Sequence, residues 1–367
     1  MGACYVRFMV DSQKTQLVEV DSEESNLYGF SLAEMEHFFR KLGEKPFRAK
    51  QLFQWIYKYG VDDFEEMTDF SKSLRIKLNS TAKLVRPNFC GRQSSTESEE
   101  RTTQKLLFQL SDGQKIETVY IPDDARRTVC VSTQAGCAVG CTFCATGWMG
   151  FKRNLTVGEI VGQLGYVLKK VDPTISNIVF MGMGEPFLNY ENVIRAAQIF
   201  SSESGMSIAA KHITISTSGI IPRIYQYADD RHPFNLAISL NATTSESRRS
   251  VMPITSKYSM EELLKAADYY IRSRRRTHLT LEYVLLAGVN DSDEDARRLK
   301  KMVSELGRCK LNVIPYNPIE GPSLKRPSED RINAFLRKVS TIQSPLTLRR
   351  SRGQDIAAAC GQLAVQN

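Results

Sequence analysis

The 367-residue chain has no uninterrupted apolar run long enough to cross a bilayer, which argues against a protein anchored by transmembrane helices. Its start, MGACYVRFMVDSQKTQ, lacks the basic, apolar and small-residue regions of a signal peptide. Eight cysteines are too few in a chain of this length for a secreted disulfide scaffold. Internal repeats and low-complexity segments are absent as well. With 42% hydrophobic and 25% charged residues, the sequence predicts a globular, cytoplasmic protein.

The net charge of +8 is unevenly distributed along the chain. Residues 131–367 carry 30 basic and 21 acidic side chains, so this part alone holds +9. The clusters RSRRR (272–276) and RRSR (349–352) are suited to a polyphosphate backbone. On charge alone, solvated surfaces without a partner explain the clusters equally well.

The first third of the chain predicts short helices followed by a β-hairpin. SLAE (31–34) fits a capping box, with Ser31 as N-cap and Glu34 three residues on. The segment PFRAKQLFQWIYK mixes aromatic and basic residues; it suits an amphipathic core helix by default, and an RNA-contacting helix as the alternative. KLLFQLSDGQKIETVYIP (105–122) predicts two strands joined around Asp112-Gly113.

From about residue 128 the pattern alternates strand and helix. Six strand-like runs alternating with helices predict a parallel sheet with right-handed crossovers. Six units fall short of the eight in a full barrel, so an incomplete barrel and an open sheet both fit. The expected strand ends, CVSTQAGC, MGMGEP, STSG, SLNA and IPYNP, are rich in small and polar residues. Such a rim is typical of a ligand site at the carboxyl ends of the strands.

Three cysteines follow the first of these strands. AGCAVGCTFCATG places Cys137, Cys141 and Cys144 in a C-x3-C-x2-C run. Three thiolates can hold a [4Fe–4S] cluster and leave one iron open, which makes a metal centre catalytic rather than structural. Zinc is the alternative, but it would need a nearby histidine as fourth ligand. The four histidines all lie away from the run: His37, His212, His232 and His278.

This cysteine run resembles that of the radical S-adenosylmethionine (SAM) superfamily. A Gly-Glu-Pro element after the second strand is a further mark of that superfamily, and Gly184, Glu185 and Pro186 match it here. The resemblance implies that the open iron binds the amino and carboxylate groups of SAM, whose cleavage yields a 5′-deoxyadenosyl radical. It also implies that Glu185 accepts a hydrogen bond from the SAM ammonium group.

A longer set of segments narrows the resemblance. TVCVSTQAGCAVGCTFCATG, GFKRNLTVGEIVGQ, MGMGEP, ITISTSGIIP, LAISLNA and RGQDIAAACGQLA are together similar to RNA adenine methyltransferases of the RlmN/Cfr family. The likeness runs from about residue 30 to the C-terminus, and IETVYIP favours the RlmN branch. It implies an α/β fold: an incomplete (β/α)6 radical SAM barrel with a small N-terminal helical domain and a β-hairpin linker. The expected parts are an RNA-binding accessory domain (1–90), the hairpin linker (91–122), the radical SAM core (123–355) and a tail with a catalytic cysteine (356–367).

The resemblance also implies roles for three residues outside the cysteine run. Cys360 would be methylated by one SAM molecule, and a radical from a second would let that carbon add to adenine. Glu117 would accept the substrate proton, and Cys130 would release the product by forming a disulfide with Cys360. Without the resemblance, inert thiols and an exposed strand carboxylate are the simpler interpretations.

Further SAM contacts follow from the same motifs. The matching positions are Ser216, Ser239, Leu240, Asn241 and Asn317. Asn241 departs from the family, which usually has histidine there; asparagine can hydrogen-bond but cannot titrate near neutrality.

The implied function is methylation of adenosine C2 in 23S ribosomal RNA and in transfer RNA 3′ of the anticodon. C2 is electrophilic, so a polar methyl transfer cannot reach it and radical addition is required. The expected partners are these RNAs and an electron donor such as flavodoxin or ferredoxin, with no membrane and a monomeric chain. A Cfr-like adenine C8 methyltransferase and a non-catalytic iron–sulfur RNA-binding protein are the alternatives. The pair Cys130 and Cys360 argues against the second, because a binding module needs neither.

Overall fold

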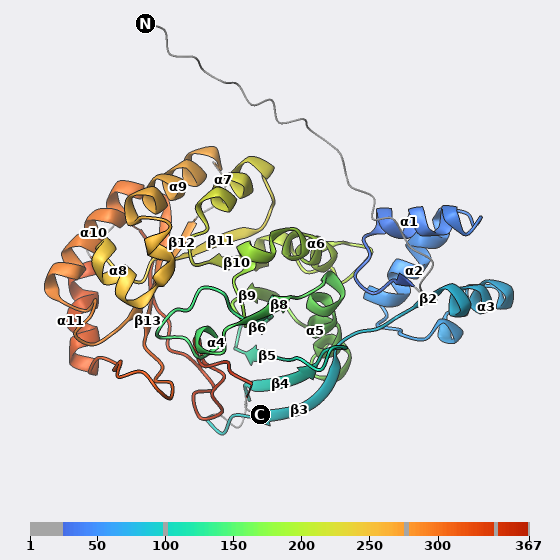
Figure 1. Ribbon diagram of the computed structural model, residues 1–367, viewed down its shortest axis with the longest axis horizontal. Coiled ribbons are helices and arrows are strands. Elements are labelled where there is room, and N and C mark those ends of the chain that lie inside the picture. Colours follow the sequence, from blue (N-terminus) through green and yellow to red (C-terminus); the bar gives the residue numbers. More distant parts are fainter. Residues whose placement is uncertain (1–24, 98–101, 275–278, 341–343, 366–367) are drawn as a thin grey trace, which may run out of the picture.

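A computed structural model describes residues 25–97, 102–274, 279–340 and 344–365. His278 and part of the RSRRR run lie outside these residues. Figure 1 shows a curved sheet with helices on its outer side and a small helical unit at one end of the molecule. Within the described ranges, no helix is both long and apolar enough to cross a membrane.

The centre of the molecule is a ten-stranded sheet in the order β14-β13-β12-β11-β10-β9-β6-β5-β4-β3. The strands from β14 to β6 are mutually parallel: β6 (Arg127–Cys130), β9 (Asn177–Phe180), β10 (Ile213–Thr217), β11 (Asn235–Ser239), β12 (Leu279–Leu285), β13 (Cys309–Pro315) and β14 (Leu346–Leu348). The six predicted strands are therefore confirmed, and β14 adds a short seventh that the sequence pattern did not predict. The sheet has two edges, β3 and β14, and it is curved with helices on its outer side, so it is an incomplete barrel (Figure 1).

Helices connect the parallel strands and cover the outer face of the sheet (Figure 1). They are α5 (Val157–Lys170), α6 (Tyr190–Ser201), α7 (Ile221–Asp230), α8 (Ser245–Val251), α9 (Met260–Ser273), α10 (Asp293–Leu306) and α11 (Glu329–Val339). Short 3₁₀ helices lie at Phe64–Glu66, Pro186–Asn189, Ala210–His212 and Pro253–Ser256. Helix α5 begins at a capping box, in which Thr156 and Glu159 each bond the other's backbone N–H. Its apolar side chains recur at helical spacing and are buried against the sheet.

Three antiparallel strands extend the sheet beyond β6: β3 (Asn88–Ser94), β4 (Gln104–Gln109) and β5 (Lys115–Pro122). Strands β4 and β5 pair from Gln104↔Tyr120 to Gln109↔Lys115, which confirms the predicted hairpin. Gly113 adopts φ +83° in the turn, a conformation that favours glycine. The hairpin is thus hydrogen-bonded directly to the first barrel strand.

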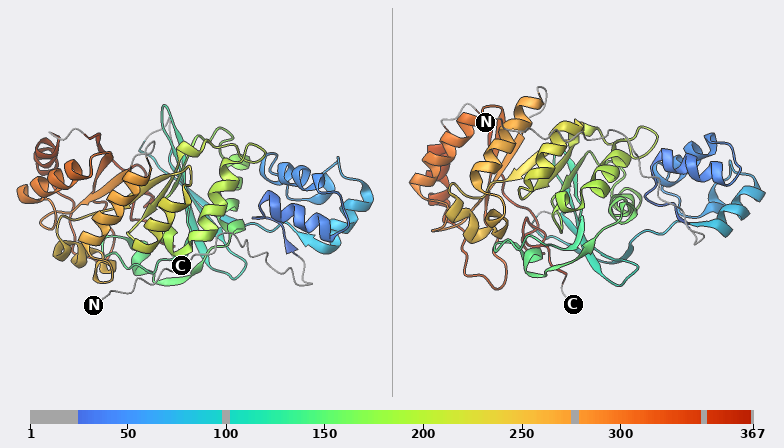
Figure 2. Two further views of the ribbon diagram at one scale, coloured as in Figure 1. Left: turned by 90° about the horizontal axis from the view of Figure 1, so that it is seen from above. Right: turned by 45° about the horizontal axis from the view of Figure 1, so that its top comes forward.

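The N-terminal unit consists of α1 (Leu32–Lys41), α2 (Phe47–Tyr57) and α3 (Lys72–Thr81), with β1 (Ser25–Asn26) paired to β2 (Ala82–Lys83). The predicted capping box at Ser31 and Glu34 is present. Leu52, Phe53 and Ile56 of α2 are buried, as expected of an amphipathic core helix. Figure 2 shows from two further directions that this unit lies at the opposite end of the molecule from α10 and α11.

The N-terminal unit packs closely against α5 and α6. A Cβ on Gly29, which has φ +105°, would lie 2.4 Å from the backbone nitrogen of Gly158, so glycine is required at this contact. The Glu34 carboxylate pairs with Arg195 of α6. The buried side chains of the N-terminal unit and those of the barrel belong to one continuous hydrophobic core, so the unit is fixed to the barrel.

Candidate active site

A cavity of about 160 Å³ lies at the carboxyl ends of the parallel strands. Most of the predicted site residues line it: Cys137, Cys141, Cys144, Gly184, Glu185, Ser216, Ser239, Asn241, Asn317 and Cys360. Cys130, Glu117 and Leu240 lie outside its lining. The small and polar residues expected at the strand ends therefore line one cavity.

The cysteine loop is held by a small second sheet that the sequence did not predict. Strand β7 (Gln134–Gly136) pairs antiparallel with β8 (Phe151–Asn154), and the cysteines lie between β7 and α4 (Ala145–Trp148). The Cys137 N–H donates to the Gly150 carbonyl at 3.0 Å. Gly136 has φ +73°, and a Cβ there would lie 1.8 Å from that same carbonyl oxygen. The backbone therefore fixes where the three thiols lie.

Because they are buried, these three thiols lose their protons less readily unless a cation is bound nearby. Burial raises the pKa of Cys137 to about 12 and raises the pKa values of Cys141 and Cys144 as well, and the neighbouring cysteines of the run add to the increase for Cys137 and Cys141. The three thiols line one cavity, and three thiolates at this spacing can hold a [4Fe–4S] cluster.

The first prediction concerns this metal centre. Protein reconstituted without oxygen should bind about four irons per chain, because three thiolates can hold a [4Fe–4S] cluster. Cys141→Ala should lose the cluster, since its sulfur comes from the middle of the run. Iron analysis with electron paramagnetic resonance of the reduced protein measures both. Cys309→Ala, which removes a buried thiol outside the cavity, is the control. Stoichiometric zinc without iron would contradict the assignment.

Glu185 is buried and fixed by the protein's own donors. Its Oε1 accepts from the Phe187 N–H at 2.9 Å and from Thr217 Oγ1 at 2.7 Å, and its Oε2 accepts from the Ser218 N–H at 2.7 Å. Burial raises its pKa, and these hydrogen bonds oppose the increase. A carboxylate offers about four acceptor positions, so about one remains for a ligand such as the SAM ammonium group.

Four buried polar atoms of the cavity residues lack partners. Among the residues that the structure describes, no hydrogen-bond partner is found for Ser218 Oγ, Glu282 Oε1, Tyr316 OH and Asn317 Oδ1. Buried polar atoms are nearly always hydrogen-bonded, so these four indicate a polar ligand. The cavity thus fits a small molecule with several donors, as SAM is.

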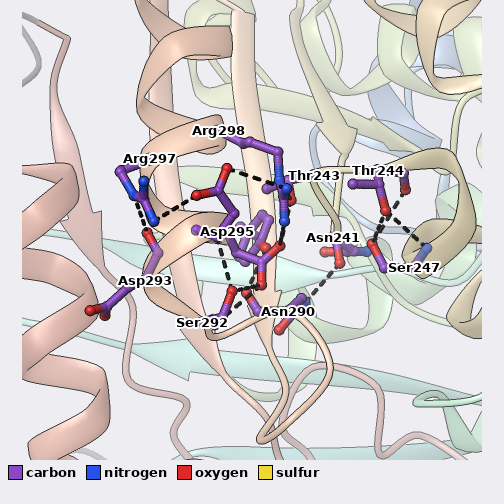
Figure 3. Close-up of polar contacts among 12 residues, drawn as sticks. Asn241, Thr243, Thr244, Ser247, Asn290, Ser292, Asp293, Asp295, Arg297 and Arg298 are labelled. Carbon is purple, nitrogen blue, oxygen red and sulfur yellow. Dashed lines mark hydrogen bonds and ion pairs between the residues drawn. The ribbon is translucent and has the colours of Figure 1, made fainter.

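Of the segment Ser239-Leu240-Asn241, Ser239 and Asn241 line the cavity and Leu240 does not. Leu240 is fully buried, its N–H donates to the Glu282 carbonyl and its carbonyl accepts from Arg248. Asn241 has φ +56°, a left-handed conformation that asparagine tolerates better than most residues. Its Oδ1 accepts from the Val284 N–H at 2.8 Å, and its carbonyl accepts from Asn290 (Figure 3). Asn241 therefore joins the end of β11 to β12, because its side chain and its carbonyl are both hydrogen-bonded within the protein.

Sequence reasoning missed two buried charged residues at the site. Glu282 interrupts the apolar strand THLTLEYVLL, and this isolated acid was the signal that could have identified it. Its Oε2 accepts from Ser216 Oγ at 3.0 Å, and burial raises its pKa. Arg248 is fully buried and donates to the carbonyls of Ser218, Ser239 and Leu240. It joins the ends of β10 and β11, and no local pattern distinguished it from Arg249 beside it.

The three predicted catalytic residues outside the cysteine run lie around one face of the hairpin. Val119 is paired with Cys130, and Glu117 is two residues from Val119, so Glu117 and Cys130 point to the same side of the sheet. Burial and the neighbouring Cys360 raise the pKa of Cys130 to about 12. Glu117 is buried, and desolvation raises its pKa. Cys130 therefore lies near enough to Cys360 for the charge of one thiol to affect the other, as does Cys144 of the cysteine run.

Comparisons with known proteins agree with this geometry. The chain matches the models of the ribosomal RNA large subunit methyltransferase N-terminal domain over residues 25–84 and of the radical SAM superfamily over residues 131–299. It is 42% identical to the "Probable dual-specificity RNA methyltransferase RlmN" of Bacillus licheniformis over 96% of this chain and 97% of that protein. It is 40% identical to the dual-specificity RNA methyltransferase RlmN of Psychrobacter arcticus, over 96% and 90%. The crystal structure of a radical SAM methyltransferase from Sphaerobacter thermophilus superposes with a TM-score of 0.88 at 42% identity, over 93% of this chain and 100% of that one.

Proposed function

Because the chain belongs to the RlmN family of radical SAM RNA methyltransferases, we propose that it methylates ring carbon C2 of adenosine in RNA. The proposed substrates are 23S ribosomal RNA and the transfer RNA adenosine 3′ of the anticodon, since its relatives are named dual-specificity RNA methyltransferases. The observation that carries the proposal is that Cys360 lines the same cavity as the clustered cysteines.

The cavity residues divide into two sets of ligands. Cys137, Cys141 and Cys144 would hold the [4Fe–4S] cluster. Glu185 and Asn317 would bind SAM through the acceptor positions that the protein leaves open. When bound, the cluster and SAM supply the methyl carbon and the one-electron chemistry that activates it.

Cys360 is the proposed carrier of the methyl carbon. Its carbonyl accepts from Asn317 Nδ2 at 3.0 Å. The next residue, Gly361, accepts from the Ala145 N–H at 2.7 Å, and Thr146 Oγ1 donates to the Leu363 carbonyl at 2.6 Å. These bonds attach the tail to α4, which directly follows the cysteine loop. The sulfur of Cys360 is therefore held close to the cluster ligands, where a carbon bound to it can be activated.

Glu117 and Cys130 would complete the reaction. Once a methylene radical on Cys360 adds to the adenine ring, the radical adduct must lose one electron and one proton to restore the ring. The cluster would serve as the one-electron acceptor, and Glu117 accepts the proton displaced from C2. The Cys130 sulfur then attacks the Cys360 sulfur. A sulfur–sulfur bond forms as the carbon–sulfur bond breaks, and the thiol proton of Cys130 passes to the released electron pair to give the methyl group. Cellular thiols reduce the disulfide and restore both cysteines.

The second prediction concerns the product. Purified enzyme should convert adenosine to 2-methyladenosine in both RNAs, because the relatives are RlmN enzymes and the IETVYIP segment with Glu117 favours the same branch. Mass spectrometry of nucleosides from digested RNA, against standards of both isomers, makes the assignment. Protein without SAM is the control. Only 8-methyladenosine would place the chain with the Cfr branch, and RNA binding without any methyladenosine would favour a non-catalytic binding protein.

We also propose that the N-terminal unit helps to bind RNA. Phe47 and Tyr59 expose 54% and 56% of their surface at the two ends of α2. The Arg48 guanidinium lies 4.9 Å from the Phe47 ring centre, and Lys58 Nζ lies 5.8 Å from that of Tyr59. Exposed aromatic rings beside positive charge suit stacking on unpaired bases with phosphate contacts.

A further inference from the structure

Lys105 and Glu117 form a buried ion pair beside the site. Leu107 of β4 is paired with Glu117 of β5, and Lys105 lies two residues from Leu107, so both charged side chains point to the same face. Lys105 Nζ lies 3.2 Å from Glu117 Oε1, and the two side chains are only 11% and 5% exposed. Neither the family motifs nor the cavity lining includes Lys105.

The two oxygens of Glu117 have different environments. Oε1 is bound by Lys105, whereas Oε2 is buried and has no hydrogen-bond partner within the described part of the chain. A buried carboxylate is costly to ionise, so burial raises the pKa of Glu117; the charge and hydrogen bond of Lys105, together with the Ala364 N–H, lower it. Cys130, on the neighbouring strand and the same face, has a pKa of about 12 and contributes no charge near neutrality.

Lys105 also contacts the segment that carries Cys360. Its Nζ donates to the Ala357 carbonyl at 3.5 Å, three residues before Cys360. Ala357 has φ +50°, a left-handed conformation that is unfavourable for alanine and must be held by its surroundings. The Lys105 ammonium group thus contacts both Glu117 and the C-terminal tail that carries Cys360.

We propose that Lys105 is a positioning residue for the methylation reaction: it keeps Glu117 ionised with Oε1 fixed, leaving Oε2 to accept the substrate proton. The inference rests on the role proposed for Glu117. The proton leaves the adenine carbon for Oε2, and its bonding electrons remain on the ring. The contact with Ala357 places this base at a constant position relative to Cys360.

A purely structural ion pair is the alternative. Breaking a buried pair by removing one partner commonly destabilises a protein, so a loss of activity in a Lys105 variant is not decisive by itself. The pH dependence separates the two roles, because loss of stability does not move the pKa of the base. An opposite charge at this distance lowers a carboxyl pKa by about 1–3 pH units.

The third prediction is therefore a displaced pH profile. The turnover rate should rise with pH as Glu117 loses its proton, and in Lys105→Met this rise should move to higher pH by about one pH unit or more. Below the rise, Lys105→Met should be slower by about tenfold for each pH unit that the rise has moved, and it should recover at higher pH. Lys105→Arg keeps the charge and should retain a profile near that of the wild type. Single-turnover rates of RNA methylation across pH give the profile.

An infrared titration supplies a readout that does not depend on turnover. The protonated carboxyl band that disappears in Glu117→Gln should titrate at higher pH in Lys105→Met than in the wild type. Lys105→Gln serves as a second neutral variant if Lys105→Met folds poorly. Lys169→Met is the matched control, because Lys169 likewise joins a carboxylate, Asp62, to a carbonyl, Gly60, but lies away from the cavity.

The outcomes separate this inference from the proposed function. An unchanged profile and carboxyl band in Lys105→Met, with Glu117→Gln still impaired, would overturn the inference and leave the proposed function intact. A fully active Glu117→Gln would show that Glu117 is not the base, and the inference would fail with it. An equal displacement of the profile in Lys169→Met would show that the effect is not specific to Lys105.

Discussion

Replacing Cys360 by alanine should reduce RNA methylation to background, a loss of at least about a thousandfold. The physical reason is that adenine C2 is electrophilic, so without the Cys360 sulfur no group in the cavity can carry the incoming carbon to it. Cys360 is only partly buried, so the fold and the cluster should remain intact. Mass spectrometry of the RNA gives the product, and mass spectrometry of the intact protein gives the methyl group carried by the cysteine.

Two variants make this test specific. Cys90→Ala removes an exposed thiol from β3, far from the cavity lining, and should leave both methylation and protein methyl content unchanged. Cys360→Ser preserves the size of the side chain but replaces the sulfur, and it should be as inactive as Cys360→Ala. Methyladenosine formed by either Cys360 variant would show that the carbon reaches RNA without this residue.

Six of the seven parallel strands were predictable because each is a short apolar run and helices alternate with them along the chain. The capping box at Ser31 and the turn at Asp112-Gly113 were equally local signals, and both are confirmed. Strand β14 is only three residues long, and it is a strand because it pairs with β13. Pairs of this kind, including β7 with β8, depend on tertiary contacts that local patterns do not encode.

The site was predictable where chemistry requires a fixed spacing along the chain. Cys137, Cys141 and Cys144 are close in sequence, and Gly184 and Glu185 follow a strand end, so local motifs identified them. Lys105 carries no such signal, and for Glu282 the sequence offered only an isolated acid within an apolar strand. Each acts through a partner on another strand, Lys105 through Glu117 and Glu282 through Ser216, and only strand register brings these pairs together.

Asn241 differs from the histidine that usually stands at this position in the family. It lines the cavity, so a SAM contact there stays a prediction. Its side-chain amide accepts from the Val284 N–H and contacts Met252, in a left-handed backbone conformation. The side chain is therefore held in place by the protein, which the motif match alone did not indicate.

Cys130→Ala should stop the reaction one step later than Cys360→Ala and should trap RNA on the protein. The carbon–sulfur bond between Cys360 and the base does not hydrolyse readily, so release requires a second thiol next to Cys360. Cys130 is the proposed second thiol, because it is near enough for the charge of Cys360 to raise its pKa and lies outside the run that would hold the cluster. The variant should still carry a methyl group on Cys360 and should still begin the radical step.

The trapped complex has a direct signature. A denaturing gel should show a slower protein band that nuclease collapses to the mobility of the free protein, with less than one turnover of free product. Cys309→Ala also removes a buried thiol, one packed at the start of β13 outside the cavity, and should turn over without accumulating this band. The double variant Cys130→Ala/Cys360→Ala should form no adduct, because the sulfur that makes the bond is gone. Normal turnover by Cys130→Ala would mean that another thiol, or water, releases the product, and the two-cysteine mechanism would then be wrong for this protein.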